Sequence, residues 1–148
     1  MEYDEVVQRM APCGLDCSRC ADHQTGEIGE LSKKLLELVD GYERVAAIKS
    51  KMIPAFEGFG NFKEVLNIFS AASCGGCRSG NVKCPIHCHV KACCKGHDID
   101  FCFQCKEYPC SKEMDERLTA RWMEKNDRMK EIGVVNFYQE ERKQPRYK

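Results

Sequence analysis

A chain of 148 residues fits one domain, or one domain that carries a small metal-held lobe. Its composition, 43% hydrophobic and 31% charged, excludes wholesale disorder, and no apolar run approaches the roughly 18 to 20 residues that a membrane span needs. The acidic start has no apolar segment behind it, so we expect no secretory signal and place the protein in the reducing cytoplasm.

Cysteine is the most unusual component of the chain, with 12 residues among 148. In a reducing compartment such a pattern indicates metal binding more often than disulfides. Two thiolates separated by two residues can bind one ion, because the intervening turn aims both sulfurs inward and its amides donate to them. The cysteine spacing therefore predicts that metal ions hold part of the fold.

The first cysteine motif in chain order is C-x3-C-x2-C, formed by Cys13, Cys17 and Cys20. Radical S-adenosylmethionine enzymes bind a [4Fe–4S] cluster with this spacing, but they usually have an aromatic residue where this chain has Arg19. They also need a barrel of repeated βα units, for which 148 helix-patterned residues are too few. We therefore reject this enzyme class.

Three amphipathic helices are predicted within residues 27–70. Apolar residues recur at helical spacing over residues 27–39 and again over 45–56. Asn61, with Glu64 three residues later, resembles a capping box that opens the third helix. We expect these three helices to form the main hydrophobic core.

Residues 74–110 form a segment of a different kind. They contain nine of the twelve cysteines and little aliphatic bulk, so metal crosslinks would have to replace a hydrophobic core. Cys84, followed by a proline, resembles the start of a short helix that ends at Gly96. On that helix Cys84 and Cys88 would share a face, whereas Cys93 would point about 140° away from Cys88, which favours different ions.

A longer helix is predicted after the last cysteine, with Ser111 as its N-cap and Gly133 as its end. A short helix through residues 134–138 then leads into a basic tail over 142–148. The periodicity indicates no clear strands.

The predicted fold class is mainly α, a small helical domain with an irregular, metal-crosslinked cysteine-rich lobe of zinc knuckles. We assign residues 1–148 to a single cysteine-rich metal-binding domain. Its helical part covers about 27–70 and 111–142, and its metal-held lobe combines 13–20 with 74–110.

Zinc is the expected metal, with two or three ions per chain. An iron–sulfur cluster is the alternative cofactor, but the ferredoxin run C-x2-C-x2-C-x3-C-P is absent, and knuckles spread over separate segments favour four-coordinate zinc. The expected ligands are Cys13, Cys17, Cys20, Cys74, Cys77, Cys84, Cys88, Cys93, Cys102, Cys105 and Cys110.

No catalytic residue is assigned, because no Ser/His/Asp or Cys/His pairing stands out. A zinc-thiolate enzyme or a redox protein stays open as an alternative, since such thiolates can act as nucleophiles and C-x2-C pairs can exchange disulfides. His87 and His89 flank Cys88 and could replace a thiolate, although we favour exposed or supporting roles. His97 is assigned to the end of the short helix, and His23 belongs to no motif.

A nucleic-acid-binding zinc module is a further alternative. Residues 78–106 carry a mild basic cluster, but a zinc ion with four thiolates has a net charge of about −2 that nearby lysines would offset. Nothing resembles a recognition helix, so nucleic acid is a less favoured partner than protein. The cluster consists of Arg78, Lys83, Lys91, Lys95 and Lys106.

Taken together, the motifs resemble a cysteine-rich bacterial and archaeal family, the domain of unknown function numbered 3795. The similar segments are Cys13-Gly-Leu-Asp-Cys-Ser-Arg-Cys20, Cys74-Gly-Gly-Cys-Arg78, Cys88-His-Val-Lys-Ala-Cys93 and Phe101-Cys-Phe-Gln-Cys-Lys-Glu-Tyr-Pro-Cys110. The resemblance implies a zinc-binding protein without an established activity. Cys84 and Cys94 depart from the family pattern; Cys84 can bind metal with Cys88, and Cys94 is expected to be a buried thiol without a metal.

We conclude that the sequence describes a structural zinc-binding protein of unknown biological role. A binding or adaptor module is favoured over an enzyme, because zinc sites filled by four cysteines have no open coordination position for a substrate.

Overall fold

The structure of the protein, a computed structural model, describes residues 1–86, 88–111 and 116–147. The chain divides into two compact units, and each is treated by itself: Met1–Cys20 with Cys74–Lys148, and Ala21–Ser73. We call them the cysteine unit and the hairpin unit. All twelve cysteines lie in the cysteine unit.

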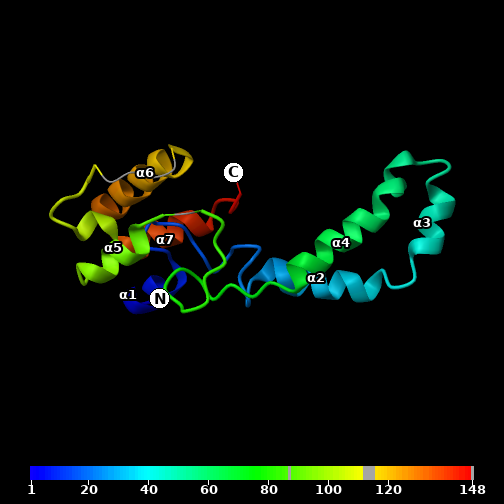
Figure 1. Ribbon diagram of the computed structural model, residues 1–148, viewed down its shortest axis with the longest axis horizontal. Helices are drawn as coiled ribbons and strands as arrows, with labels where there is room; N and C mark the ends of the chain where they lie inside the picture. The colour runs from blue at the N-terminus through cyan, green and yellow to red at the C-terminus, as the bar shows by residue number, and fades with distance from the viewer. Residues whose placement is uncertain (87, 112–115, 148) are drawn as a thin grey trace. The chain divides into compact units, whose positions relative to one another are not determined.

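The described residues contain seven α-helices and two short 3₁₀ helices (Figure 1). No strand occurs among them, and β-type pairing is confined to isolated bridges, one of which joins Met10 and Asp16. The prediction of a mainly α fold is therefore confirmed. The cysteine unit contains α1 (Tyr3–Arg9), α5 (Val90–Gly96), η2 (Cys102–Gln104), α6 (Glu116–Ile132) and α7 (Val134–Arg142); the hairpin unit contains α2 (Glu27–Leu38), α3 (Glu43–Lys49), η1 (Pro54–Gly58) and α4 (Phe59–Ser70).

The larger core lies in the cysteine unit, where α7 packs against both α1 and α6. The α1 helix was not predicted, because a helix of only seven residues shows little apolar periodicity. Its two buried valines nevertheless anchor the first residues of the chain to this core. The core residues are Val6, Val7, Met10, Phe101, Met129, Val134, Phe137 and Tyr138.

A second buried cluster joins α5 and α6 to the first cysteine motif. It consists of Ala11, Cys13, Val90, Cys94, Leu118 and Trp122, with further cysteines partly buried at its edge. Two of its six members are thus cysteines, which shows how little aliphatic material this part of the unit has.

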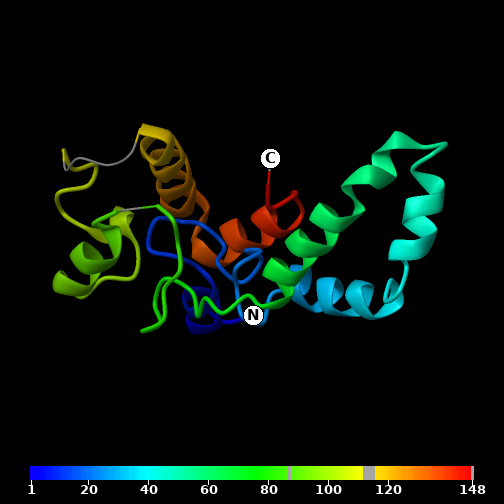
Figure 2. The same ribbon diagram turned by 45° about the vertical axis from the view of Figure 1, so that its right-hand side comes forward.

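The hairpin unit is built from α2 and α4, which lie side by side and antiparallel in both views, with α3 at the far end (Figures 1 and 2). The helices approach closely at Gly29, where an added Cβ would stand 3.0 Å from the Phe69 carbonyl oxygen. Few side chains are buried here, and large ones such as Leu38 and Ile68 are 82% and 66% exposed. The expectation that these helices form the main core is therefore wrong.

Helix ends were predicted with mixed success. The run over 27–39 corresponds to α2, and Gly133 separates α6 from α7 as expected. The helix expected to start at Cys84 begins only at Val90, although it does end at Gly96. The expected capping box at Asn61 does not form, because α4 already begins at Phe59.

The helix start predicted at Ser111 involves residues 112–115, which lie outside the described residues. Within the part of the chain that the structure describes, no helix combines the length and the apolar character that crossing a membrane requires.

Candidate metal-binding cysteine groups

The first cysteine motif is a tight loop between α1 and the residues that follow Cys20. The amide of Cys17 donates to the Arg9 carbonyl at 2.9 Å, and the amide of Ala11 donates to the Leu15 carbonyl at 2.8 Å. Gly14 has a φ of +89°, and an added Cβ would stand 2.7 Å from the Cβ of Lys125. The loop therefore requires glycine at this position, both for its backbone conformation and for its contact with α6.

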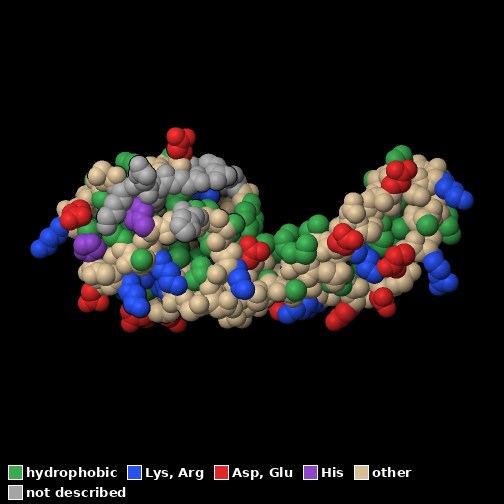
Figure 3. Space-filling view, in the orientation of Figure 1, with side chains coloured by type: hydrophobic (Ala, Val, Ile, Leu, Met, Phe, Trp, Pro, Cys, Tyr) green, Lys and Arg blue, Asp and Glu red, His purple; other side chains and the backbone are tan. Residues whose placement is uncertain are grey.

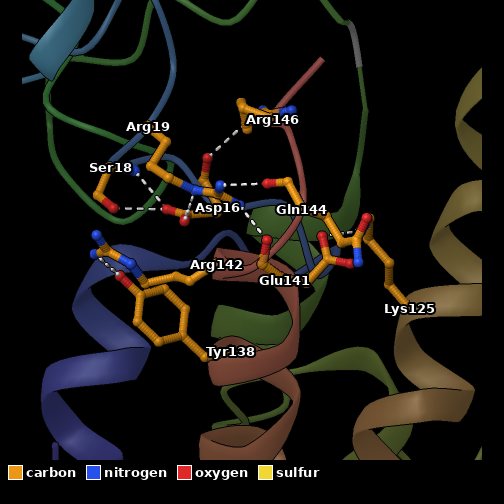
Figure 4. Close-up of polar contacts among 9 residues, drawn as sticks. All are labelled: Asp16, Ser18, Arg19, Lys125, Tyr138, Glu141, Arg142, Gln144 and Arg146. Atoms are coloured by element: carbon orange, nitrogen blue, oxygen red, sulfur yellow. Dashed lines mark hydrogen bonds and ion pairs between the residues drawn. The ribbon is translucent and has the colours of Figure 1, made fainter. Parts of the chain in front are cut away.

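Asp16 and Arg19 of the same motif tie the loop to the end of α7 (Figure 4). The buried carboxylate of Asp16 accepts hydrogen bonds from the Ser18 amide at 3.0 Å and from Arg19 Nε at 2.7 Å. The other two guanidinium nitrogens of Arg19 donate to the carbonyls of Glu141 and Gln144, each at 2.9 Å. A cation at a helix C-terminus binds carbonyls that the helix leaves unpaired, so Arg19 stabilises the position of Cys17 and Cys20.

The second motif contains Arg78, which crosslinks three segments of the cysteine unit. Its Nε donates to the Met10 carbonyl at 2.9 Å and its Nη2 to the Asp100 carbonyl at 2.7 Å. The guanidinium also lies over the Phe101 ring, 5.0 Å from its centroid. Lys91, another member of the predicted basic cluster, donates to the Ser79 carbonyl at 2.8 Å. Both side chains are occupied by backbone carbonyls, which leaves less of the cluster for a nucleic acid.

The thiols of the first motifs lie near enough to affect the ionisation of one another. Burial first, and then the nearby sulfurs of Cys77, Cys17 and Cys88, raise the pKa of Cys13 to about 12. Burial likewise raises the pKa of Cys77 to about 11, with further contributions from Cys17, Cys88 and Cys84. The cysteines that affect one another in this way come from three separate stretches of sequence.

The remaining cysteines of the same segments belong to this group as well. Burial raises the pKa of Cys17, the Cys77 amide lowers it by donating to the sulfur, and Cys20 and Cys74 lie near enough to raise it. The Cys74 sulfur also accepts the amide of Lys83 at 3.3 Å. We call the whole set the first thiol group: Cys13, Cys17, Cys20, Cys74, Cys77, Cys84 and Cys88.

The other five cysteines line a small cavity beside α5 and α6, of about 20 Å³. His89, Tyr108 and Trp122 contribute to the same wall. The sulfur atoms of Cys94 and Cys102 are 3.7 Å apart. We call these cysteines the second thiol group: Cys93, Cys94, Cys102, Cys105 and Cys110.

Asn126 of α6 links the two groups through hydrogen bonds. It is fully buried, and its Oδ1 accepts the amide of Phe103 at 3.0 Å, inside the turn between Cys102 and Cys105. Its Nδ2 donates to the carbonyls of Trp122 at 3.0 Å and Cys13 at 3.4 Å. The side-chain amide of Asn126 thus binds backbone groups near both thiol groups and connects the two groups through α6. Asn126 was not among the predicted site residues, because its sequence neighbours indicate only a polar position on a helix.

The eleven cysteines predicted as ligands thus fall into the two groups, and Cys94, which was left out, lies within the second. All twelve cysteines belong to the described residues, and the structure has them as thiols rather than disulfides. Among the described residues, no three Cys, His, Asp or Glu side chains stand close enough to form a ready ligand set for a metal. The donors are suited to zinc by chemistry, but binding would require side-chain rotation.

The histidines contribute little to these groups. His97 is the C-cap residue of α5, as predicted, and the ring of His23 stays local, with Thr25 Oγ1 3.2 Å from its Nδ1. His89 lines the cavity of the second thiol group. His87 lies outside the described residues.

A larger cleft, of about 550 Å³, opens between α6 and α7 away from the cysteines. Its charged side chains pair with one another: Lys125 with Glu141, and Arg128 with both Glu131 and Glu140. The pKa of Arg128 is raised by hydrogen bonds to Glu140 and Glu131.

Comparison with known proteins identifies the family. The family model described as "Protein of unknown function (DUF3795)" matches residues 9–115. No curated protein and no solved structure matches the chain. The matched residues include all twelve cysteines and therefore both thiol groups. Because the match covers well over half of the chain, the protein belongs to the DUF3795 family.

Proposed function

We propose that the protein binds at least two zinc ions through its cysteines and that these ions maintain the fold of residues 74–110. The observation that supports this proposal is that seven cysteines from three stretches of sequence lie near enough to shift the pKa values of one another in the first thiol group. Thiols brought together in this way repel one another once ionised, and a divalent cation would turn that repulsion into attraction. Bound zinc would supply a structural crosslink.

Zinc fits the residues better than the alternatives. The donors are almost entirely sulfur, which suits zinc and iron–sulfur clusters, but they stand on separate loops with knuckle spacing, which is typical of four-coordinate zinc. Ions enclosed by four thiolates would leave no position for a substrate, and the cleft between α6 and α7 lies away from the cysteines. A binding role is therefore favoured over an enzymatic one.

Elemental analysis of the protein purified without added metal tests this proposal. We expect two or three zinc ions per chain and little iron. The Cys77→Ser variant should lose about one ion, because the thiols of Cys17, Cys88 and Cys84 all lie near enough to raise the pKa of Cys77. Met52→Ser is the matched control, since it removes a sulfur from a residue of the hairpin unit that is 74% exposed.

Two outcomes would contradict the proposal. A colourless, folded, metal-free protein with disulfides would exclude metal as the structural crosslink. A brown protein with acid-labile sulfide would assign the cysteines to an iron–sulfur cluster instead.

We further propose that the binding role belongs to the hairpin unit and that its partner is a second copy of this chain. In α2, the exposed residues Leu31, Leu35 and Leu38 follow helical spacing. In α4, the exposed residues Phe62, Val65 and Ile68 do the same. Figure 3 shows hydrophobic side chains at the surface of this unit.

The two rows lie on one face of the hairpin. With 100° between successive residues, each row is rotated in the same sense from the buried residues of its own helix, which are Gly29 and Ser32 in α2 and Leu66 in α4. Because the two helices are antiparallel, equal rotations bring the rows to the same side. We call the six residues the hairpin face.

Several properties of the hairpin face favour a second copy as its partner. Its six residues carry no charge, so the same face on two copies can pack together in an isologous dimer without bringing like charges into contact. Burying a Leu, Ile, Val or Phe contributes about 1.5–3 kcal/mol, so six half-exposed residues on each copy contribute on the order of 10 kcal/mol. Association costs about 4–15 kcal/mol, which predicts a weak, concentration-dependent dimer.

Sedimentation of the full chain over a range of concentrations tests this second proposal. The wild type should reach the mass of a dimer, and Ile68→Glu should stay monomeric because a charge would be buried. Lys33→Glu, an exposed change away from the face, should dimerise like the wild type. A wild type that stays monomeric at every concentration would contradict dimerisation and leave the face to a different protein.

A further inference from the structure

Cys94, the one cysteine that was not predicted to bind metal, belongs to the second thiol group. It is only 2% exposed, and it packs among Val90, Leu118 and Trp122. Its sulfur is 3.7 Å from that of Cys102. In a tetrahedral site with zinc–sulfur distances of about 2.3 Å, two sulfurs stand about 3.8 Å apart. The observed separation therefore suits two ligands of one ion, although it also suits an S–H···S hydrogen bond.

The surrounding cavity favours the ion. A volume of about 20 Å³ is close to that of a single water-sized sphere, and sulfur-bearing side chains supply five of its lining residues. A pocket of atomic size lined by thiols has the dimensions and the chemistry of a zinc site.

An unused donor in the same wall supports this interpretation. Trp122 Nε1 is buried, and within the described residues it is the one buried side-chain nitrogen or oxygen without a hydrogen-bond partner. An unpaired buried N–H is unfavourable by about 1–3 kcal/mol, so such a donor is rarely left without a function. Thiolates that ligate zinc accept N–H hydrogen bonds, and the indole lines the cavity where those thiolates would form.

The turn that carries Cys102 is already shaped for a metal. The Cys105 amide donates to the Cys102 carbonyl at 2.9 Å, which closes a knuckle turn over η2. Asn126 then fixes this turn to α6 through the Phe103 amide. Cys110 follows five residues later and lines the same cavity. Four thiols from α5 and the loop that follows it thus line one cavity, and a bound ion would draw their sulfurs together.

We propose that Cys94 and Cys102 bind the same zinc ion, with Cys105 and Cys110 as the other two ligands. This inference rests on the proposed zinc function and assigns one site within it. It departs from the family pattern, in which the neighbouring Cys93 is the expected ligand. Because successive helical residues point about 100° apart, Cys93 and Cys94 point in different directions, and only Cys94 binds this ion.

Cadmium substitution of the full chain tests the assignment directly. With ¹¹³Cd in place of zinc, scalar couplings connect each metal resonance to the β protons of the cysteines that bind it. We expect one resonance coupled to both Cys94 and Cys102. A resonance coupled to Cys102 and Cys93 but not to Cys94 would overturn the inference and leave the zinc function standing. A folded chain without any bound cadmium would contradict the proposed function itself.

A pair of neighbouring variants gives a second readout. Cys94→Ala keeps a small apolar side chain in the buried cluster and should weaken binding of this one ion by at least about 100-fold, more than supporting residues usually do. Cys93→Ala should weaken it less. The resonances of the first thiol group report on folding in both variants. Weaker binding in Cys93→Ala than in Cys94→Ala would overturn the inference.

Discussion

Residues that lie between the cysteines of each motif connect separate segments of the chain through hydrogen bonds. Asp16 and Arg19 connect the first motif to α7, and Arg78 connects the second motif to the segments around Met10 and Asp100. Arg19 is the residue that argued against a radical enzyme, and its contacts explain why an arginine stands there. A guanidinium can donate to several carbonyls at once, which a lysine does less well.

Gly14 gives the sharpest test of the first loop. Gly14→Ala should destabilise the cysteine unit by about 2 kcal/mol or more, because it combines a positive φ with a steric conflict against α6. The added Cβ would stand 2.7 Å from Lys125 Cβ. Urea unfolding followed by Trp122 fluorescence measures the change.

Gly133→Ala is the matched control for that variant. Gly133 has a φ of +84° and a ψ of 152° but nothing within 4 Å of an added Cβ, so it should show only the backbone cost of about 1–3 kcal/mol. Equal losses in the two variants would mean that the contact between the loop and α6 contributes nothing.

Tyr3 gives a pH-dependent prediction. Its hydroxyl donates to Asp100 Oδ2 at 2.9 Å and accepts from Gln104 Nε2 at 3.0 Å. Burial first, and then the Asp100 carboxylate against the opposing effect of Gln104, raise the pKa of Tyr3 above its usual value. A group whose pKa is raised on folding stabilises the fold fully below its unfolded pKa, which is about 10, and loses that contribution as the pH rises through the folded pKa.

Tyr3→Phe should therefore lower the free energy of unfolding by about 1 kcal/mol near pH 8. The difference from the wild type should shrink above pH ~10, because the wild-type phenol then ionises beside a carboxylate. Urea unfolding of both proteins at pH 8 and pH 11 measures this. A difference that stays constant or grows would contradict the assigned hydrogen bonds.

At the scale of elements, the contact between α2 and α4 depends on a small residue. Gly29→Ala should destabilise the hairpin unit, because the new Cβ would stand 3.0 Å from the Phe69 carbonyl oxygen. Gly60→Ala, in α4 and with nothing within 4 Å, should stabilise it by about 0.5–1 kcal/mol through helix propensity. Thermal unfolding followed by circular dichroism compares the two, and stabilisation of similar size in both would contradict the close approach.

Helix prediction succeeded where local signals were sufficient. The α2 run and the break at Gly133 follow from periodicity and from glycine, both of which act within a few residues. The start of α5 was placed too early, because a proline after Cys84 permits a helix without requiring one. The short α1 escaped notice because seven residues give little periodicity, and its burial depends on α7.

At the scale of the whole molecule, metal should contribute unequally to the two units. Chelation is expected to remove amide protection from residues 74–110 first, because cysteines take the place of aliphatic residues in the cluster around Trp122. The hairpin unit contains no cysteine and should keep its protection. Hydrogen exchange with mass spectrometry, before and after chelation, measures the order. Simultaneous loss across all 148 residues would show a single cooperative unit instead.

The sequence by itself determined the helical class, the family and the cysteine spacing, because each of these depends on neighbouring residues. Tertiary structure alone decided which cysteines meet, since that depends on loops held by Arg19, Arg78 and Asn126. The tertiary structure also decided which apolar residues are buried. The pattern over residues 27–70 predicts apolar helix faces, but many large side chains on these faces are exposed in the folded chain. Periodicity reveals the direction in which side chains point, whereas burial depends on what other parts of the chain bring against them.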